Sequence, residues 1–140
     1  MKFPAWLRVY GDQSWRGDCP TESAEQVTFI NRLRTRWPDT IGRVVVHIQN
    51  EGKRHAWQAQ RDKAAGMAAG AADIVVPGRV TLLIELKRRD HTKSRFQPGQ
   101  VEYLQAAHDM GAFVCVALGA DAAMQAVEAW QALQKESPSA

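Results

Sequence analysis

The sequence has only two cysteines in 140 residues, Cys19 and Cys115, and they are far apart in the chain. Cys115 lies in an apolar run typical of a strand, so we expect two free thiols and a cytoplasmic location in a bacterial or phage-infected cell. We expect no secretory leader, because residues 1–4 are not followed by an apolar segment. Nor is any apolar run long enough to span a membrane.

A strong excess of one charge is also missing. Lys and Arg number 18 against 15 Asp and Glu, which gives a net charge of +3. This weak basic balance leans towards polyanionic partners and decides nothing by itself. The length and the 45% hydrophobic content predict one globular domain over residues 1–140. We divide it into an irregular arm (1–20), a core (21–119) and a C-terminal helix with its tail (120–140).

The stretch from Asp73 to Lys87 predicts a β-hairpin, with strands at 73–76 and 80–87 that reverse at Pro77-Gly78. Side chains alternate between the two faces of a strand. One face of the second strand is wholly apolar, whereas the other carries Glu85 and Lys87. We expect Asp73 opposite residue 83 or 84, within one step of Glu85. Two carboxylates so placed could hold one hard cation, with Lys87 beside them.

A structural explanation of the same residues stays open. Glu85 and Lys87 would then lie on the solvated face of an edge strand, and Asp73 would only cap its partner. The wholly apolar second face and the position of the aspartate favour a site over this alternative.

The remaining patterns place helices and strands around the hairpin. They predict a helix over about 21–37 with Thr21 as N-cap, a strand over 43–48 and a helix over about 53–69. After the hairpin come a helix over about 98–110, a strand over 113–118 and a last helix capped by Asp121. The fold class is therefore α/β, with a mixed central sheet flanked by helices.

Three polar side chains are expected to point inward from helices. Glu22 and Gln26 are stacked at i and i+4 on the buried arc of the first helix, and Gln100 shares a face with Leu104. Taken alone, Glu22 is better explained as an acid favoured at a helix N-terminus. The inward amide of Gln26 beside it makes it the candidate for a polar site beneath the helix. The loop after Lys87 is basic and is expected to contact backbone phosphates. Its candidate nucleic-acid-binding residues are Arg88, Arg89, Lys93, Ser94 and Arg95. A basic face on the helix over 53–69 is a second such candidate.

Taken in order, these residues resemble the PD-(D/E)XK nuclease superfamily, and within it the VRR-NUC branch with its small stand-alone phage and bacterial members. The resemblance covers about residues 21–119 and implies a restriction-endonuclease-like α-β-β-β-α-β core. The matching pieces are Glu22 with Gln26, residues 47–52, Gly66 and Gly70 before Asp73, Ile84-Glu85-Leu86-Lys87, Ser94, and Gln100 with Leu104 and Gly111. One departure is Ala72, where the family usually has proline.

The resemblance and the residues together imply a DNA endonuclease that depends on Mg²⁺ or Mn²⁺. The expected metal ligands are Asp73, Glu85 and the carbonyl of Leu86, with Glu22 joining directly or through water. Lys87 would orient the attacking water or stabilise developing charge, and Gln26 and Gln100 would position groups around it. The resemblance also implies selection of branched, flap or Holliday-junction DNA and a homodimer.

Two other functions compete with this hypothesis. A module of the same fold could bind nucleic acid without cleaving it, which the intact Asp73, Glu85 and Lys87 set disfavours. An HNH-type nuclease would use His47, His55 or His91, but no His-Asn-His hairpin pattern is present. His47 lies in a β-branched run and is expected to be a core histidine. Zinc sites are disfavoured because the cysteines and histidines lack ligand spacing.

Overall fold

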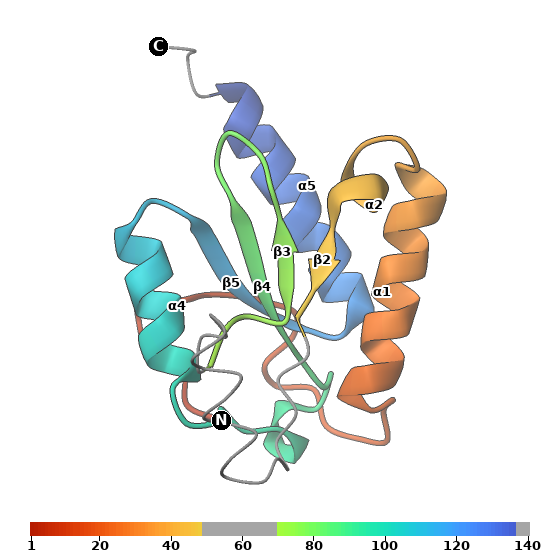
Figure 1. Cartoon of the computed structure of the whole chain (residues 1–140). Helices are drawn as coiled ribbons and strands as arrows, with labels where there is room; N and C mark the ends of the chain where they lie inside the picture. The colour runs from red at the N-terminus through yellow and green to blue at the C-terminus, as the bar shows by residue number, and fades with distance from the viewer. Residues whose placement is uncertain (49–69, 137–140) are drawn as a thin grey trace, which may run out of the picture.

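A five-stranded mixed sheet forms the centre of the protein (Figure 1). The structure is a computed structural model that describes residues 1–48 and 70–136. The strand order is β1-β5-β4-β3-β2. The strands are β1 (Arg8–Tyr10), β2 (Val46–His47), β3 (Ile74–Val76), β4 (Leu82–Lys87) and β5 (Phe113–Leu118). β5 runs parallel to both β1 and β4, whereas β3 is antiparallel to β4 and to β2. The expected mixed α/β architecture is confirmed.

Helices cover both faces of this sheet (Figure 1). One face packs against α1 (Glu22–Arg36), the short α2 (Ile41–Val44) and α5 (Ala120–Glu136). The other face packs against α4 (Gln100–Asp109) and the N-terminal segment, and a 3₁₀ turn, η1 (His91–Lys93), follows β4. Thr21 caps α1 as expected, because its hydroxyl accepts a hydrogen bond from the amide of Ala24. No helix in the described residues is long and apolar enough to cross a membrane.

The predicted hairpin is present, and its second strand lies at the centre of the sheet. β4 has β3 on one side and β5 on the other, and all six of its residues are buried. The alternative of a solvated edge strand is therefore excluded. The β3–β4 register pairs Ile74 with Ile84, and one further step brings Asp73 level with Glu85. The predicted partner of Asp73, residue 83 or 84, was wrong, and the true register brings the two carboxylates closer.

The expected strand over 43–48 is mostly wrong. Residues 41–44 form α2, and only Val46–His47 is extended. Gly42 explains the difference, because its amide donates to the Trp37 carbonyl at 2.8 Å and a Cβ there would lie 2.6 Å from the carbonyl oxygen of Leu33. This contact with the end of α1 sustains a helical turn through residues with high strand propensity. His47 is exposed rather than in the core.

Two predictions at the chain ends also differ from the structure. The arm over 1–20 is not wholly irregular, because β1 extends the sheet beside β5. α5 starts at Ala120, whose amide donates to the carboxylate of Glu25 on α1, so Asp121 is not the cap. The interstrand pairing and the long-range cap both depend on tertiary contacts.

Some predictions cannot be compared with the structure. The predicted helix over 53–69, its basic face, and His55, Glu51, Gly52 and Gly66 lie outside the described residues.

Gly70, just before the hairpin, packs closely against the backbone at the start of α4. A side chain at this position should therefore destabilise the fold. The φ of Gly70 is +73°, and a Cβ would lie 2.3 Å from the backbone carbon of Gly99. Gly70→Ala should therefore lower the free energy of unfolding by about 2–3 kcal/mol, from backbone strain and the clash together.

Gly111→Ala is the matched control, because Gly111 also has a positive φ (+97°) but open space around its Cβ position. It should cost only about 1 kcal/mol. Urea unfolding followed by circular dichroism measures both values. Equal losses for the two variants would show that Gly70 is not closely packed against Gly99.

Candidate functional site

Asp73 and Glu85 meet at the end of the hairpin that leads into the basic loop. Asp73 precedes β3, and its Oδ2 accepts a hydrogen bond of 2.9 Å from the amide of Leu86. This bond fastens the carboxylate across β4. Glu85 projects from the face of β4 that packs towards α4, and its side chain is 1% exposed. The predicted carboxylate pair is therefore present.

Gln100, the first residue of α4, orders the other side chains of the site. Its Nε2 donates to Glu85 Oε1 at 2.8 Å, and its Oε1 accepts from Lys87 Nζ at 3.1 Å. The same Oε1 also accepts from the amide of Gln97 at 2.7 Å. Because a side-chain amide has one donor end and one acceptor end, these bonds fix its orientation. Gln100 thus occupies Oε1 of Glu85 and leaves Oε2 free.

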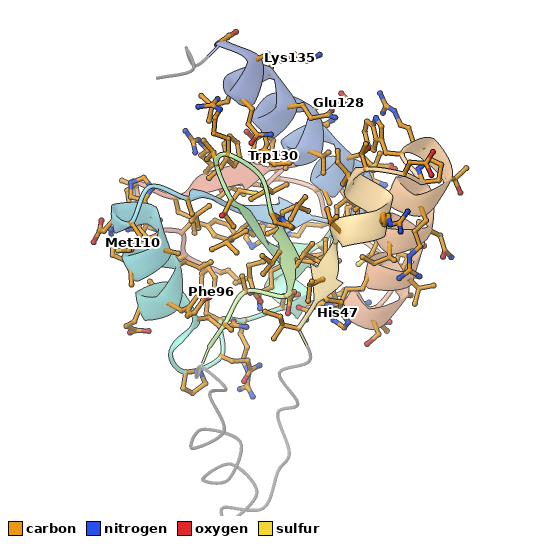
Figure 2. The ribbon with its side chains drawn as sticks, turned by 45° about the horizontal axis from the view of Figure 1, so that its top comes forward. His47, Phe96, Met110, Glu128, Trp130 and Lys135 are labelled. Atoms are coloured by element: carbon orange, nitrogen blue, oxygen red, sulfur yellow. The ribbon has the colours of Figure 1, made fainter. Side chains whose placement is uncertain are left out.

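Lys87 is buried, and its ammonium group is held in place by neighbouring protein oxygens. It donates to the carbonyl of Arg95 at 2.8 Å as well as to Gln100, and it lies 3.4 Å from Glu85 Oε1. The centroid of the Phe96 ring lies 5.6 Å from Nζ. Phe96 itself lies near the N-terminal end of α4 (Figure 2). Sequence reasoning did not identify Phe96 or the main-chain carbonyl of Arg95, because main-chain acceptors leave no pattern in a sequence.

Glu22 approaches this cluster from the first turn of α1. Ser94 holds it, donating from Oγ to Glu22 Oε1 at 2.8 Å while accepting from the amide of Arg88 at 3.1 Å. Burial is the main cause of a raised pKa of Asp73, and the negative charge of Glu22 adds to it. Within the described residues, no group of three or more His, Cys, Asp or Glu has the geometry to hold a metal ion. The role of Glu22 as a metal ligand, directly or through water, stays a prediction.

The two central carboxylates are poorly stabilised as anions. Burial raises the pKa of Glu85 well above its usual value, and the charge of Asp73 raises it further. Burial likewise raises the pKa of Asp73. Glu85 Oε2 is buried with no hydrogen-bond partner among the described residues. Such an oxygen requires either a cation or a proton, which Glu85 would share with the neighbouring Asp73 carboxyl. The donor set, two carboxylates with hard oxygen atoms, therefore fits a divalent cation.

Gln26 is not brought into this cluster. It lines a separate hollow between α1 and β2, together with His47 and Arg34. His91 is also apart, since its Nε2 lies 2.9 Å from the carbonyl of Gln13. His47 and His91 thus lie on different elements without a shared site, which fits the absence of an HNH pattern.

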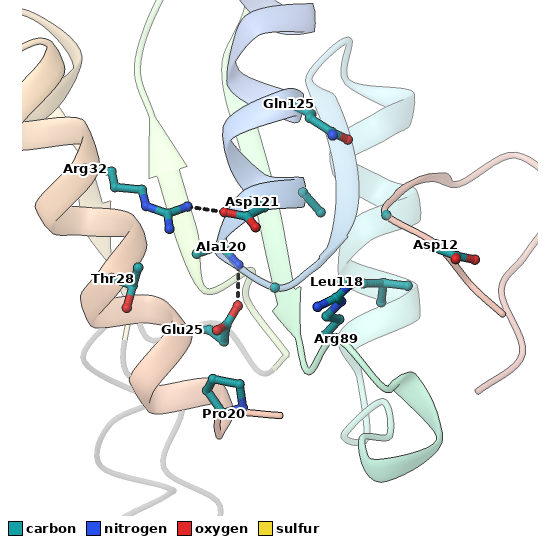
Figure 3. A pocket seen from close by; sticks show the side chains of 13 residues that line it. Asp12, Pro20, Glu25, Thr28, Arg32, Arg89, Leu118, Ala120, Asp121 and Gln125 are labelled. Carbon is teal, nitrogen blue, oxygen red and sulfur yellow. Dashed lines mark hydrogen bonds and ion pairs between the residues drawn. The ribbon is translucent and has the colours of Figure 1, made fainter. Parts of the chain in front are cut away.

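The residues of the basic loop are divided between two surfaces. Arg88, Lys93, Ser94 and Arg95 line a groove beside Glu22. The guanidinium of Arg89 instead lies 4.1 Å from the ring centroid of Trp15. Arg89 lines a separate cavity of about 290 Å³ at the start of α5 (Figure 3).

Comparisons with known proteins identify the fold. A solved structure described as a "VRR_NUC domain protein" matches with a TM-score of 0.69 and 21% sequence identity, over 85% of this chain and 93% of that chain. No family model and no curated protein sequence matches. The fold is therefore restriction-endonuclease-like, as the resemblance implied, and the match extends beyond the core over 21–119.

The raised pKa of Glu85 makes the stability of the metal-free protein depend on pH. A carboxyl whose pKa is higher folded than unfolded keeps its proton on folding, so it contributes stability at low pH. That contribution is lost as the pH rises from about 4.3, the ordinary glutamate pKa, through the raised value. In EDTA, the melting temperature should therefore fall between pH 5 and pH 8.

Glu85→Gln removes the titrating group and keeps its shape. Over the same pH interval, the melting temperature of the variant should fall less than that of the wild type. The difference should be at least about 3 °C, which corresponds to about 1 kcal/mol. Differential scanning calorimetry of both proteins measures this difference. Parallel pH profiles would contradict the assignment of a buried, proton-binding Glu85.

Proposed function

We propose that this protein is a metal-dependent DNA endonuclease that hydrolyses phosphodiester bonds. The observation that carries the proposal is the unpartnered buried oxygen of Glu85 beside Asp73, within reach of a fixed Lys87. This arrangement costs stability, so a purely structural role does not explain it. The restriction-endonuclease-like fold supports the same function.

Mg²⁺ or Mn²⁺ is the expected cofactor. Asp73 and Glu85 would hold it, with the carbonyl of Leu86 as a further ligand and Glu22 acting through water. The cation would supply Lewis acidity and lower the pKa of bound water. Hard oxygen ligands favour these ions over softer metals.

The protein's own residues would orient the reaction. The ammonium group of Lys87 lies beside Glu85 Oε1. From this position Lys87 would either position the attacking water or stabilise charge that develops on the phosphate. Gln100 keeps both groups in place through its two ends. Gln26 lies apart, so any positioning role for it requires contact with DNA along the hollow at α1.

The substrate is proposed to be branched DNA, such as flaps or Holliday junctions, cleaved by a homodimer. Arg88, Lys93 and Arg95 of the basic loop offer contacts to backbone phosphates, which carry little sequence information. A two-fold dimer would direct two sites at two strands. We place this activity in the cytoplasm of a bacterial or phage-infected cell, and the two free cysteines are compatible with that.

Removal of the catalytic groups should abolish cleavage without unfolding the protein. Asp73→Ala and Lys87→Ala should each lower the rate by at least about 100-fold, since each deletes a group that acts on the reacting phosphate. The assay follows labelled linear duplex, single-stranded, flap and four-way-junction DNA with Mg²⁺, Mn²⁺ or EDTA.

Asp109→Ala and Lys135→Ala are matched controls, because both side chains are exposed and far along their helices. They should cleave like the wild type. Binding without cleavage in every metal condition would favour the alternative, a catalytically silent module that binds nucleic acid. Metal-dependent cleavage retained by purified Asp73→Ala would refute the assigned site.

The proposed dimer is tested separately. Light scattering should give a mass near twice the 15.6 kDa of the chain, alone or with a four-way junction. A monomeric mass under both conditions counts against the dimer and leaves the catalytic assignment intact.

A further inference from the structure

An open groove of about 610 Å³ runs between the start of α1 and the loop that follows β4. Its volume lies in the range of ligand-binding clefts. Every residue that lines it is polar or charged. Hydroxyl groups come from both walls, from Thr21 and Ser23 on one side and Thr92 on the other. None of the lining residues is apolar or aromatic, so the groove offers no aromatic ring on which a base could stack.

Positive charge dominates this groove. Arg88, Lys93 and Arg95 face one carboxylate, Glu22. Arg88 donates from Nη2 to the carbonyl of Cys19 at 2.6 Å and from Nε to that of Pro20 at 3.1 Å. These carbonyls are uncharged, so they fix the guanidinium without neutralising it. Such a preorganised cation suits a phosphate.

The other two cations remain available to a ligand. Arg95 is exposed. Lys93 lies 3.7 Å from Asp18, but both side chains are solvated, so this ion pair is weak. Residues 18–20 thus contact two of the groove's cations, Arg88 and Lys93. The sequence of this segment does not suggest that role.

The groove begins at the catalytic cluster. Glu22 lines the groove, and its charge acts on Asp73. Arg95 contributes its side chain to the groove and its carbonyl to Lys87. A strand with one phosphate at Asp73 and Glu85 would therefore place a neighbouring phosphate in the groove.

We propose that this groove is a subsite for a backbone phosphate of the cleaved DNA strand, next to the scissile phosphate, bound by Arg88 and Arg95. The inference rests on the proposed nuclease function and deepens it. Recognition here is independent of base sequence, because the groove presents cations, hydroxyls, one side-chain amide and the single carboxylate of Glu22, and these suit a phosphate backbone rather than base edges. Arg89 takes no part, since it lines the separate cavity at α5 (Figure 3).

Binding is measured in EDTA, which withholds the metal that cleavage requires, by fluorescence polarisation of a labelled four-way junction across a salt titration. Arg95→Gln and Arg88→Gln should each weaken binding about tenfold at 0.1 M salt and reduce the salt slope by about one. Arg79→Gln, the same charge change at the far tip of the hairpin, and Arg89→Gln should change affinity less than about twofold. Arg95 is exposed, so its variant tests the groove even if Arg88→Gln unfolds.

Replacement of one DNA phosphate by a neutral methylphosphonate, at each position along the strand in turn, identifies the phosphate that the groove binds. One position beside the scissile phosphate should weaken binding of the parent protein and have little further effect on Arg95→Gln. Equal losses from Arg89→Gln and Arg95→Gln would overturn the subsite, because the charge of the whole loop would then suffice.

The experiments distinguish failure of the subsite hypothesis from failure of the nuclease hypothesis. Metal-dependent cleavage by the wild type, unchanged in Arg95→Gln and Arg88→Gln, would overturn the subsite alone. Groove-dependent binding without any cleavage would support the phosphate contact and overturn the nuclease.

Discussion

The burial of Glu85 and Lys87 within the central strand is the constraint on which the site depends. Taking two charges out of water costs several kcal/mol per ion, and mutual attraction at 3.4 Å offsets this only with further hydrogen bonds. Gln100 supplies those bonds to both partners. One oxygen of Glu85 is nonetheless left without a donor. A cation bound at this oxygen would offset the free-energy cost of burying the Glu85 carboxylate. The same buried oxygen thus explains both the loss of stability without metal and the proposed metal-dependent chemistry.

Several contacts far apart in the sequence maintain this arrangement. Gly70 lets the hairpin approach Gly99, directly before Gln100. Ser94 connects the loop after β4 to Glu22 on α1. The N-terminal segment adds further links, since the amide of Gly17 donates to Asp90 and Arg88 binds the carbonyls before α1. The loop after Lys87 is therefore held on both sides, by α1 and by the N-terminal segment.

Local patterns in the sequence were sufficient to predict most of this fold. The Pro77-Gly78 turn and the alternation in β4 predicted the hairpin, and Thr21 predicted the start of α1. The Asp73, Glu85 and Lys87 set followed from side-chain alternation in the hairpin, and the inward direction of Gln100 followed from helical periodicity in α4. Periodicity could not predict β1, α2 or the start of α5, because parallel pairing with β5, the close contact of Gly42 and the cap from Glu25 are long-range interactions. It also could not separate Arg89 from Arg88, whose partners lie in the N-terminal segment.

Direct measurement of cation binding tests the central claim, that Asp73 and Glu85 hold a divalent cation. Electron paramagnetic resonance of free Mn²⁺, titrated with the protein at pH 8, reports binding without any cleavage assay. The account predicts saturable Mn²⁺ binding that Mg²⁺ competes for and that Asp73→Asn and Glu85→Gln each abolish. Binding by both variants equal to that of the wild type would contradict it.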